Sequence, residues 1–425
     1  MAEYIRRVVD DEIYELMTGL TALAIEGPRA VGKTTTAAAR AATIYRLDHE
    51  ATRRAVIDDP EIVAIGPRPI LIDDWQLVPT VWDVVRTEVD KGPGPGQFLL
   101  TGSAVPKALP AHPGSARIAS IRMRPMTLAE RGVAVPAVSL GDLLSGRLPP
   151  LRGTTTVSTA DYASEILASG FPGLRGMPAR PRRAQLDGYV TRTIERDFAE
   201  LGGETIRNRA GLRRWLRAYA GAISSTTSFE KIRDAATGGH DEKPAKTTVI
   251  RYLDVLERLW LIEPIPAWAP TNNRLRRLAQ APKHALVDPA IAARLLGTTV
   301  DTLLQGAPAG SLGPRDETLF GALFEALVAM DVRTYAQDHE AQVAHFRAWD
   351  GGREIDLIVE RADGRVVAIE VKLARTVTDR HVRHLRWLHD RLGDGLLDAI
   401  VISTGPIAYR RPDGIGVVPL ALLGA

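Results

Sequence analysis

The sequence predicts a multidomain α/β protein built around a parallel sheet. Residues 1 to about 132 alternate short apolar strands with helical stretches, a pattern typical of a parallel sheet covered by helices on both faces. Four amphipathic helical stretches follow, and two alternating strands near the C-terminus predict a β-hairpin. At 425 residues the chain exceeds the size of a single hydrophobic core, so we expect two to four domains.

Changes in amino-acid composition along the chain predict the boundaries between domains. In the first domain, short apolar runs predict strands at Ala22 to Glu26, Ile44 to Leu47, Ile70 to Ile72 and Phe98 to Leu100. Proline, glycine, serine and threonine then become frequent, which predicts an irregular connector. The expected units are the parallel-sheet domain (1–132), the connector (133–180), a helical domain (181–300) and a C-terminal α/β domain (301–425).

Overall composition narrows the class of protein. Hydrophobic residues make up 45% and charged residues 25%, as in ordinary globular proteins, and the absence of a long apolar run or secretory segment predicts a cytoplasmic location without a membrane partner. Because the chain has no cysteine, disulfides, thiolate catalysis and Cys-ligated zinc are excluded, and oxygen-bound metals such as Mg²⁺ are favoured. The net charge of +3 is too small to establish nucleic-acid binding.

Residues 27 to 34 form a complete G-x-x-x-x-G-K-T phosphate loop between an apolar strand and an Ala-rich helix. Such a turn directs backbone N–H groups toward one point, where phosphates bind. Lys33 adds a positive charge, and Thr34 supplies a hydroxyl for Mg²⁺. The predicted nucleotide contacts are Gly27, Pro28, Arg29, Ala30, Val31, Gly32, Lys33, Thr34 and Thr35, joined by Thr101 and Ser103 at the end of a later strand. The sequence therefore predicts ATP or GTP binding.

Two adjacent carboxylates end the strand that begins at Ile70. We expect Asp73 to hold Mg²⁺ through water and Asp74 to polarise the water that attacks the γ-phosphate. A shorter Asp at a position where Glu is common predicts slow hydrolysis. Thr101 or Ser103 is expected to sense the γ-phosphate. Arg117, Arg122 and Arg124 are candidates for an arginine finger, although for each one individually the sequence favours surface ion pairing.

The middle region predicts helices at 184–201, 211–223, 229–236 and 246–260. The last three, followed by an expected strand at 261–267 and a basic loop at Arg274 to Arg277, resemble a winged helix. Such domains bind DNA with the third helix in the major groove, but they also serve as protein-interaction modules, and the sequence leaves both roles open. Arginine clusters at 180–183 and 213–217 fit DNA binding or a solvated surface.

The C-terminal hairpin joins two alternating strands around Asp363-Gly364. An even register places Asp356 opposite Glu370, and Lys372 lies one pleat away on the same face, about 6 to 7 Å from Glu370. Opposed carboxylates repel each other, so we expect a divalent cation, Mg²⁺ or Mn²⁺, at Asp356 and Glu370, with Lys372 orienting water for metal-assisted hydrolysis. Glu325, on an expected helix at 317–332, completes this catalytic set. The alternative is an amphipathic hairpin with a charged surface.

The order of Glu325, Asp356 and Glu370-x-Lys372 resembles the PD-(D/E)xK nuclease superfamily, although Ile355 precedes Asp356 where that motif has proline. The whole chain resembles prokaryotic AAA-type ATPases that carry a C-terminal DUF4143 region. The resemblance rests on the phosphate loop, Leu-Ile-Asp-Asp-Trp-Gln-Leu-Val-Pro, Leu-Leu-Thr-Gly-Ser, Arg-Pro-Met-Thr-Leu-Ala-Glu at 124–130, Gly-Phe-Pro-Gly at 170–173 and Asp-Pro-Ala at 288–290. It implies a P-loop NTPase sheet, a winged-helix middle domain and a restriction-endonuclease-like C-terminal domain. It also implies ATP rather than GTP as the nucleotide.

Two functions from different classes follow. One is an Mg²⁺-dependent ATPase whose nucleotide state controls a C-terminal half that binds DNA. Whether this half also cleaves DNA is left open by the sequence. The other is a nucleotide-driven switch that acts through protein partners, with the nuclease-like domain inactive. A nucleotide kinase fits less well, because no compact acceptor lid is evident. We expect a homo-oligomer, since related ATPases complete their sites between subunits.

Overall fold

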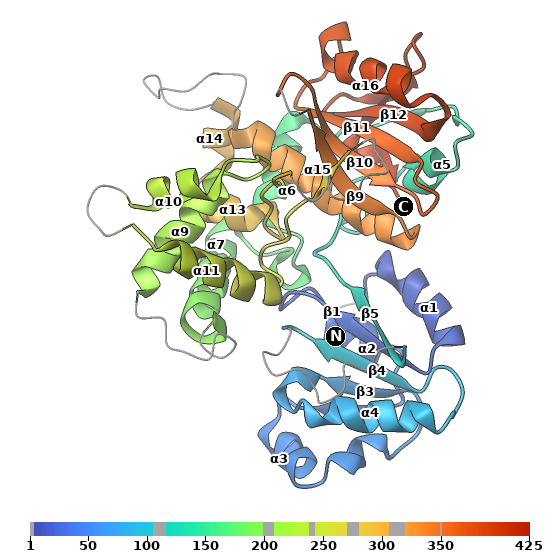
Figure 1. Cartoon of the computed structure of the whole chain (residues 1–425), viewed down its shortest axis with the longest axis vertical. Coiled ribbons are helices and arrows are strands. Elements are labelled where there is room, and N and C mark those ends of the chain that lie inside the picture. The colour runs from blue at the N-terminus through green and yellow to red at the C-terminus, as the bar shows by residue number, and fades with distance from the viewer. Residues whose placement is uncertain are drawn as a thin grey trace.

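The computed structural model describes residues 4–104, 116–198, 208–237, 243–269, 280–305, 319–348 and 351–425. In Figure 1 the first domain lies at the bottom, the helical region at the left and the C-terminal α/β region at the upper right. The N-terminal helix α1 (Val9–Gly19) contacts both β1 of the first domain and the long C-terminal helix α15 (Leu319–Asp338). Helices α1 and α15 therefore connect the first domain to the C-terminal domain.

The first domain contains the predicted parallel sheet, with five strands in the order β2-β3-β4-β1-β5. The residues of β1 alternate between two cores: Leu23 and Ile25 pack in the cluster shared with α1, whereas Ala22 and Ala24 pack in the cluster shared with α4. Burial on both faces explains the continuous apolar run. The strands and helices are β1 (Ala22–Glu26), α2 (Lys33–Ala38), β2 (Thr43–Arg46), α3 (Glu50–Asp58), β3 (Ile70–Asp73), α4 (Thr80–Asp90), β4 (Phe98–Gly102) and β5 (Ile118–Arg122).

The segment expected to be an irregular connector instead contains regular elements. These are β6 (Val138–Ser139), α5 (Leu140–Leu144), β7 (Gly153–Thr154) and α6 (Thr159–Ala168). Strand β7 pairs with β13 (Ile407–Arg410), and β6 pairs with β15 (Leu423–Gly424). Strand β7 thus forms one edge of the eight-stranded C-terminal sheet, whereas β6 and β15 form a separate two-stranded sheet. Strands of only two residues carry too little periodicity to be predicted from sequence.

The middle region is helical, as predicted. Its elements are α7 (Ala179–Arg192), which continues as a π-helical turn η4 (Thr193–Asp197), α9 (Arg209–Gly221), α10 (Phe229–Thr237), α11 (Lys246–Arg258), α13 (Pro289–Leu295) and α14 (Val300–Gln305). The strand expected at 261–267 is reduced to isolated bridges from Ile262 to Leu286 and from Ile265 to Lys283, followed by β8 (Ala267–Trp268). The basic loop Arg274 to Arg277 lies outside the described residues, and the winged-helix assignment stays a prediction.

The C-terminal domain is built on an eight-stranded mixed sheet in the order β7-β13-β14-β12-β11-β10-β9-β8. Val367 and Ile369 of β11 pack in the cluster that contains α15, whereas Val366 and Ala368 pack in the cluster that contains α16. The hairpin is therefore covered on both faces, which contradicts the alternative of an exposed amphipathic hairpin. The remaining elements are β9 (Gln342–Arg347), β10 (Glu354–Glu360), β11 (Val366–Lys372), α16 (Asp379–Leu392), β12 (Leu396–Ser403) and β14 (Gly416–Pro419).

Two sequence motifs far apart in the chain meet in the core. The carboxylate of Asp288, at the start of α13, accepts hydrogen bonds from Ser169 Oγ at 2.7 Å and from Gly170 N at 2.8 Å. Asp288 also caps its own helix through Ala290 N at 2.8 Å. These contacts give the two motifs a structural role. Among the described residues, no helix combines the length and apolar character needed to cross a bilayer.

Candidate functional site

The phosphate loop follows β1 and leads directly into α2. Gly27 has φ +150°, and a Cβ there would lie 2.2 Å from the Met123 carbonyl oxygen, so only glycine allows the loop to pass so close to the end of β5. Gly32 has φ +104°, a conformation that L side chains rarely adopt. The two glycines of the motif are thus required by packing and by backbone conformation.

Lys33 lies buried within this loop. Its Nζ donates hydrogen bonds to the carbonyl oxygens of Gly27 at 2.8 Å and Pro28 at 2.7 Å. Burial lowers the pKa of Lys33 to about 8, an effect opposed by the nearby carboxylates of Asp74 and Asp73. The loop therefore holds an ammonium group that donates hydrogen bonds to two neutral carbonyls, and a phosphate would be a stronger partner.

Thr34 and Asp73 meet at the ends of α2 and β3. Thr34 Oγ1 donates to Asp73 Oδ1 at 2.7 Å, and the Thr101 hydroxyl donates to the same oxygen. Burial raises the pKa of Asp73, and these two hydrogen bonds partly offset the increase. A hydroxyl and a carboxylate held side by side are oxygen ligands of the kind that Mg²⁺ prefers. The predicted Mg²⁺ residues therefore lie together and fit that ion.

Asp74 and Ser103 form a second layer beside this pair. Asp74 has φ +56°, and its Oδ1 accepts hydrogen bonds from Gln76 Nε2 at 2.9 Å and Ser103 Oγ at 3.2 Å. Its backbone N donates to Thr101 Oγ1 at 3.2 Å. The structure thus brings together the predicted residues of both strand ends. Their catalytic roles stay a prediction.

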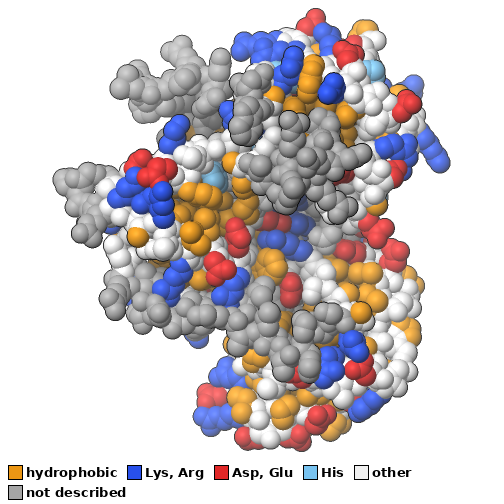
Figure 2. All heavy atoms as spheres, in the orientation of Figure 1, with side chains coloured by type: hydrophobic (Ala, Val, Ile, Leu, Met, Phe, Trp, Pro, Cys, Tyr) orange, Lys and Arg blue, Asp and Glu red, His pale blue; other side chains and the backbone are white. Residues whose placement is uncertain are grey.

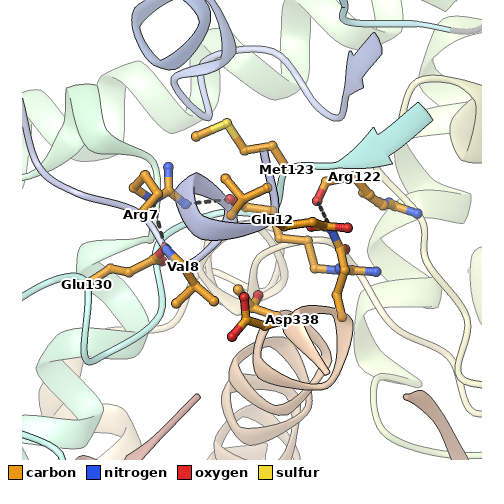
Figure 3. Close-up of a pocket in the computed structure, with 11 residues that line it drawn as sticks. Arg7, Val8, Glu12, Arg122, Met123, Glu130 and Asp338 are labelled. Atoms are coloured by element: carbon orange, nitrogen blue, oxygen red, sulfur yellow. Dashed lines mark hydrogen bonds and ion pairs between the residues drawn. The ribbon is translucent and has the colours of Figure 1, made fainter. Parts of the chain in front are cut away.

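The phosphate loop is connected to the rest of the molecule by two arginines. Arg7, which is buried, donates to the Val31 carbonyl at 2.8 Å, to the Arg124 carbonyl at 2.8 Å and to Glu130 at 3.0 Å. Figure 3 shows Arg7 and Glu130 beside each other, above the end of α15 at Asp338. Arg29 of the loop forms a 3.0 Å ion pair with Asp197 of η4. The loop therefore contacts both the N-terminal segment and the helical domain.

The three arginine-finger candidates all form ion pairs within the chain. Arg117 lies 2.8 Å from Asp90 at the surface. Arg122 and Arg124 lie 3.1 and 2.8 Å from Glu263, which also faces Arg333 of α15 at 3.6 Å. Burial opposes ionisation of Glu263, but the three guanidinium groups hold its pKa well below the usual range. We call Glu263, Arg122, Arg124 and Arg333 the interdomain charge cluster, because it joins β5, the segment after α11 and α15.

The C-terminal hairpin has the predicted register. Leu357 pairs with Ile369, so one further step places Asp356 opposite Glu370. Lys372 Nζ lies 2.7 Å from Glu370 Oε2 and 3.4 Å from Asp356 Oδ2, and Asp356 Oδ2 also accepts a hydrogen bond from Val371 N at 2.8 Å. Burial and the neighbouring Asp356 raise the pKa of Glu370. We call the carboxylates of Glu325, Glu354, Asp356 and Glu370, together with the Lys283 and Lys372 ammonium groups that contact them, the acidic cluster.

The expected metal site at Asp356 and Glu370 differs from what the structure shows. Lys283 Nζ lies 2.8 Å from Glu325, 3.0 Å from Glu354 and 3.2 Å from Asp356. The Lys283 and Lys372 ammonium groups therefore offset the repulsion between the carboxylates. Within the described ranges, no group of three or more His, Asp or Glu residues is arranged to hold a metal. The prediction of Mg²⁺ or Mn²⁺ at Asp356 and Glu370 therefore gains no support from these contacts.

Sequence reasoning missed several residues of these sites. Lys283 and Glu263 lie in segments without a chemical motif, and Glu354 begins β10 as an ordinary charged residue. His384 of α16, 3.7 Å from Glu370 Oε1, was likewise not predicted. Arg7 precedes the first helix and carries no signal of its role. Each becomes significant only through contacts between distant parts of the chain.

Three family models match separate parts of the chain. Residues 20–131 match the AAA domain, residues 159–302 match a domain of unknown function (DUF8612), and residues 320–423 match another domain of unknown function (DUF4143). The parallel sheet with its phosphate loop thus has an AAA-type ATPase fold, as predicted. The DUF4143 match falls on the C-terminal part where the resemblance placed it.

The chain is also similar to proteins of other organisms over most of its length. Uncharacterized proteins of Mycobacterium tuberculosis (strain H37Rv) and Mycobacterium bovis are each 29% identical over 378 residues, covering 85% of this chain and 72% of the relative. A Walker-type ATPase of Pyrococcus abyssi is 15% identical with a TM-score of 0.40, over 67% of this chain and 94% of the other. The ORC2 protein of Aeropyrum pernix, solved as ADPNP and ADP complexes, is 15% identical with a TM-score of 0.29, over 72% and 96%.

Proposed function

We propose that the chain is an Mg²⁺-dependent ATPase whose nucleotide state is transmitted to its C-terminal half. The observation that carries the proposal is the contact between Thr34 and Asp73 beside the Lys33 ammonium, at the end of a loop that only glycine can form at residue 27. Lys33 would contact the β- and γ-phosphates, and Thr34 and Asp73 would hold Mg²⁺. When bound, that ion would neutralise charge on the phosphates.

Asp74 is proposed to orient the attacking water. Its carboxylate accepts hydrogen bonds from the side chains of Gln76 and Ser103, which restrict its orientation. Phosphoryl transfer requires positioning and charge stabilisation more than covalent chemistry, and this arrangement provides positioning. The short Asp side chain supports slow turnover, which suits a switch.

Contacts of the phosphate loop would transmit a change in nucleotide state to the other domains. A phosphate that draws Lys33 away from the Gly27 and Pro28 carbonyls changes the loop that Arg7 holds through Val31. Arg29 extends the same loop to the helical domain through Asp197. The interdomain charge cluster then joins β5 to α15. These contacts support a switch in which ATP binding changes how the first domain packs against the helical domain and the C-terminal domain.

Nucleotide binding tests the proposal. Isothermal titration with ATP and with GTP, each with and without Mg²⁺, should show Mg²⁺-dependent ATP binding in the wild type and its loss in Lys33→Ala. Lys91→Ala, which removes a lysine outside the loop at the end of α4, is the matched control and should bind normally. Equal affinity of the wild type and Lys33→Ala for ATP would contradict the proposal. Light scattering with and without ATP would test the expected homo-oligomer.

DNA binding by the helical domain is a second candidate. Arg214 and Arg217 of α9 and Lys231 of α10 line a cleft of about 520 Å³. Phosphate contacts made by such groups weaken steeply with salt. On the face shown in Figure 2, however, basic and acidic side chains of the described residues are interspersed, which favours the protein-partner switch. A steep loss of duplex affinity between 50 and 200 mM salt, reduced in Arg217→Ala, would support DNA binding, and no measurable affinity at low salt would exclude it.

A further inference from the structure

Lys283 occupies the centre of the acidic cluster. Its side chain is 1% exposed, and three carboxylates, those of Glu325, Glu354 and Asp356, lie within 3.2 Å of Nζ. An ammonium group has three N–H donors and no acceptor, so three carboxylates can satisfy it completely. The acidic cluster thus surrounds a cation that belongs to the chain itself.

Backbone contacts hold Lys283 and its partners in place. Lys283 N donates to the Ile265 carbonyl at 2.9 Å, and Ile265 N donates to the Lys283 carbonyl at 3.0 Å. On the opposite side, Asp356 is fixed by Val371 N, and Lys372 bridges Asp356 and Glu370. Lys283 and Asp356 therefore approach each other from two segments whose positions are set by separate hydrogen bonds.

We propose that Lys283 fills the position of a divalent cation in this cluster, so that the wild-type cluster takes up neither Mg²⁺ nor Mn²⁺ and performs no metal-assisted hydrolysis. A metal ion would need to lie about 2.0 to 2.2 Å from the same carboxylate oxygens that Nζ contacts, and two cations cannot share that space. Displacing Lys283 would leave a buried ammonium without a partner, which is strongly unfavourable. The C-terminal domain is then a structural or binding module that keeps the layout of a hydrolytic site. This inference does not depend on the nucleotide site.

The test measures Mn²⁺ binding to the nucleotide-free full chain by electron paramagnetic resonance. Four proteins are compared: the wild type, Lys283→Met, the double variant Lys283→Met with Asp356→Asn, and Lys91→Met as the matched control at the surface. Methionine keeps the unbranched side chain but removes the charge. We expect Lys283→Met to gain one Mn²⁺ site at least tenfold tighter than any in the wild type, and the double variant to lose it. Lys91→Met should match the wild type.

Two results would overturn the inference. One is a Mn²⁺ site in the wild type that disappears in Asp356→Asn or Glu370→Gln. The other is a folded Lys283→Met protein, with wild-type circular dichroism, that gains no site. If Lys283→Met fails to fold, the wild type and Asp356→Asn decide the matter: a shared absence of the site supports the inference, and a site in the wild type alone refutes it.

Discussion

The interdomain charge cluster gives the most quantitative prediction. Glu263→Gln removes the only carboxylate that the described residues place within 4 Å of Arg122, Arg124 and Arg333, while nearly preserving side-chain volume. The Glu263 side chain is 11% exposed, so water compensates little. Removing one partner from a buried ion pair costs about 3 to 5 kcal/mol. We therefore expect a loss of about 4 kcal/mol in the free energy of unfolding.

Calorimetry at a fixed scan rate would measure this loss. If roughly 250 residues unfold together, each kcal/mol corresponds to about 2 °C, so the melting temperature should fall by about 8 °C. Glu15→Gln, an exposed carboxylate on α1, should shift it by less than about 1 °C, as surface substitutions usually do. A Glu263→Gln protein that melts within about 2 °C of the wild type would refute the argument that the cluster stabilises the interface.

The same cluster predicts a pH dependence. The guanidinium groups hold the folded-state pKa of Glu263 well below its unfolded value, which is about 4.3. The stabilisation is therefore complete above about pH 5 and declines as pH falls toward the folded-state pKa. The difference in melting temperature between the wild type and Glu263→Gln should shrink between pH 5 and pH 3. A difference that stays constant over this range would show that the charge of Glu263 is not its source.

Three further predictions concern the nucleotide site. Because burial lowers the pKa of Lys33 to about 8 and phosphate favours its charged form, the ATP dissociation constant should be flat below pH 7 and rise by up to about tenfold per pH unit above pH 8; titration calorimetry that finds no change up to pH 9.5 would contradict this. Gly27→Ala should abolish ATP binding, since its Cβ would lie 2.2 Å from the Met123 carbonyl, whereas Gly19→Ala, with open space around it, should bind normally in the same assay. Asp74→Asn should lower single-turnover hydrolysis by about 100-fold or more with ATP affinity within threefold of the wild type, and an unchanged rate would remove Asp74 from the proposed mechanism.

Local patterns predicted the first domain and the hairpin well. The strand ending at Asp73 and the loop from Gly27 to Thr34 are encoded in consecutive residues, and the register of Asp356 against Glu370 follows from a short turn with a fixed period of two. These features depend on neighbours in sequence. The helices α9, α10 and α11 were also predicted, because their apolar spacing matches a helical period.

Long-range contacts account for what the sequence did not reveal. Strand β7 joins the C-terminal sheet through a partner about 250 residues away, and two residues give no alternation to detect. Lys283 approaches Asp356 from 73 positions earlier in the chain, so a sequence pattern that predicts opposed carboxylates does not reveal the lysine beside them. Arg124 and Glu263 are separated by 139 positions. No period or motif signals such pairs.

Phosphate release from ATP tests the central claim most directly. The wild type should release phosphate from ATP only with Mg²⁺, at a slow but measurable rate, and Lys33→Ala should reduce this rate to background while Lys283→Met leaves it unchanged. A wild-type protein that binds no ATP and releases no phosphate with Mg²⁺ at saturating nucleotide, or a Lys33→Ala protein that hydrolyses ATP as fast as the wild type, would contradict the account.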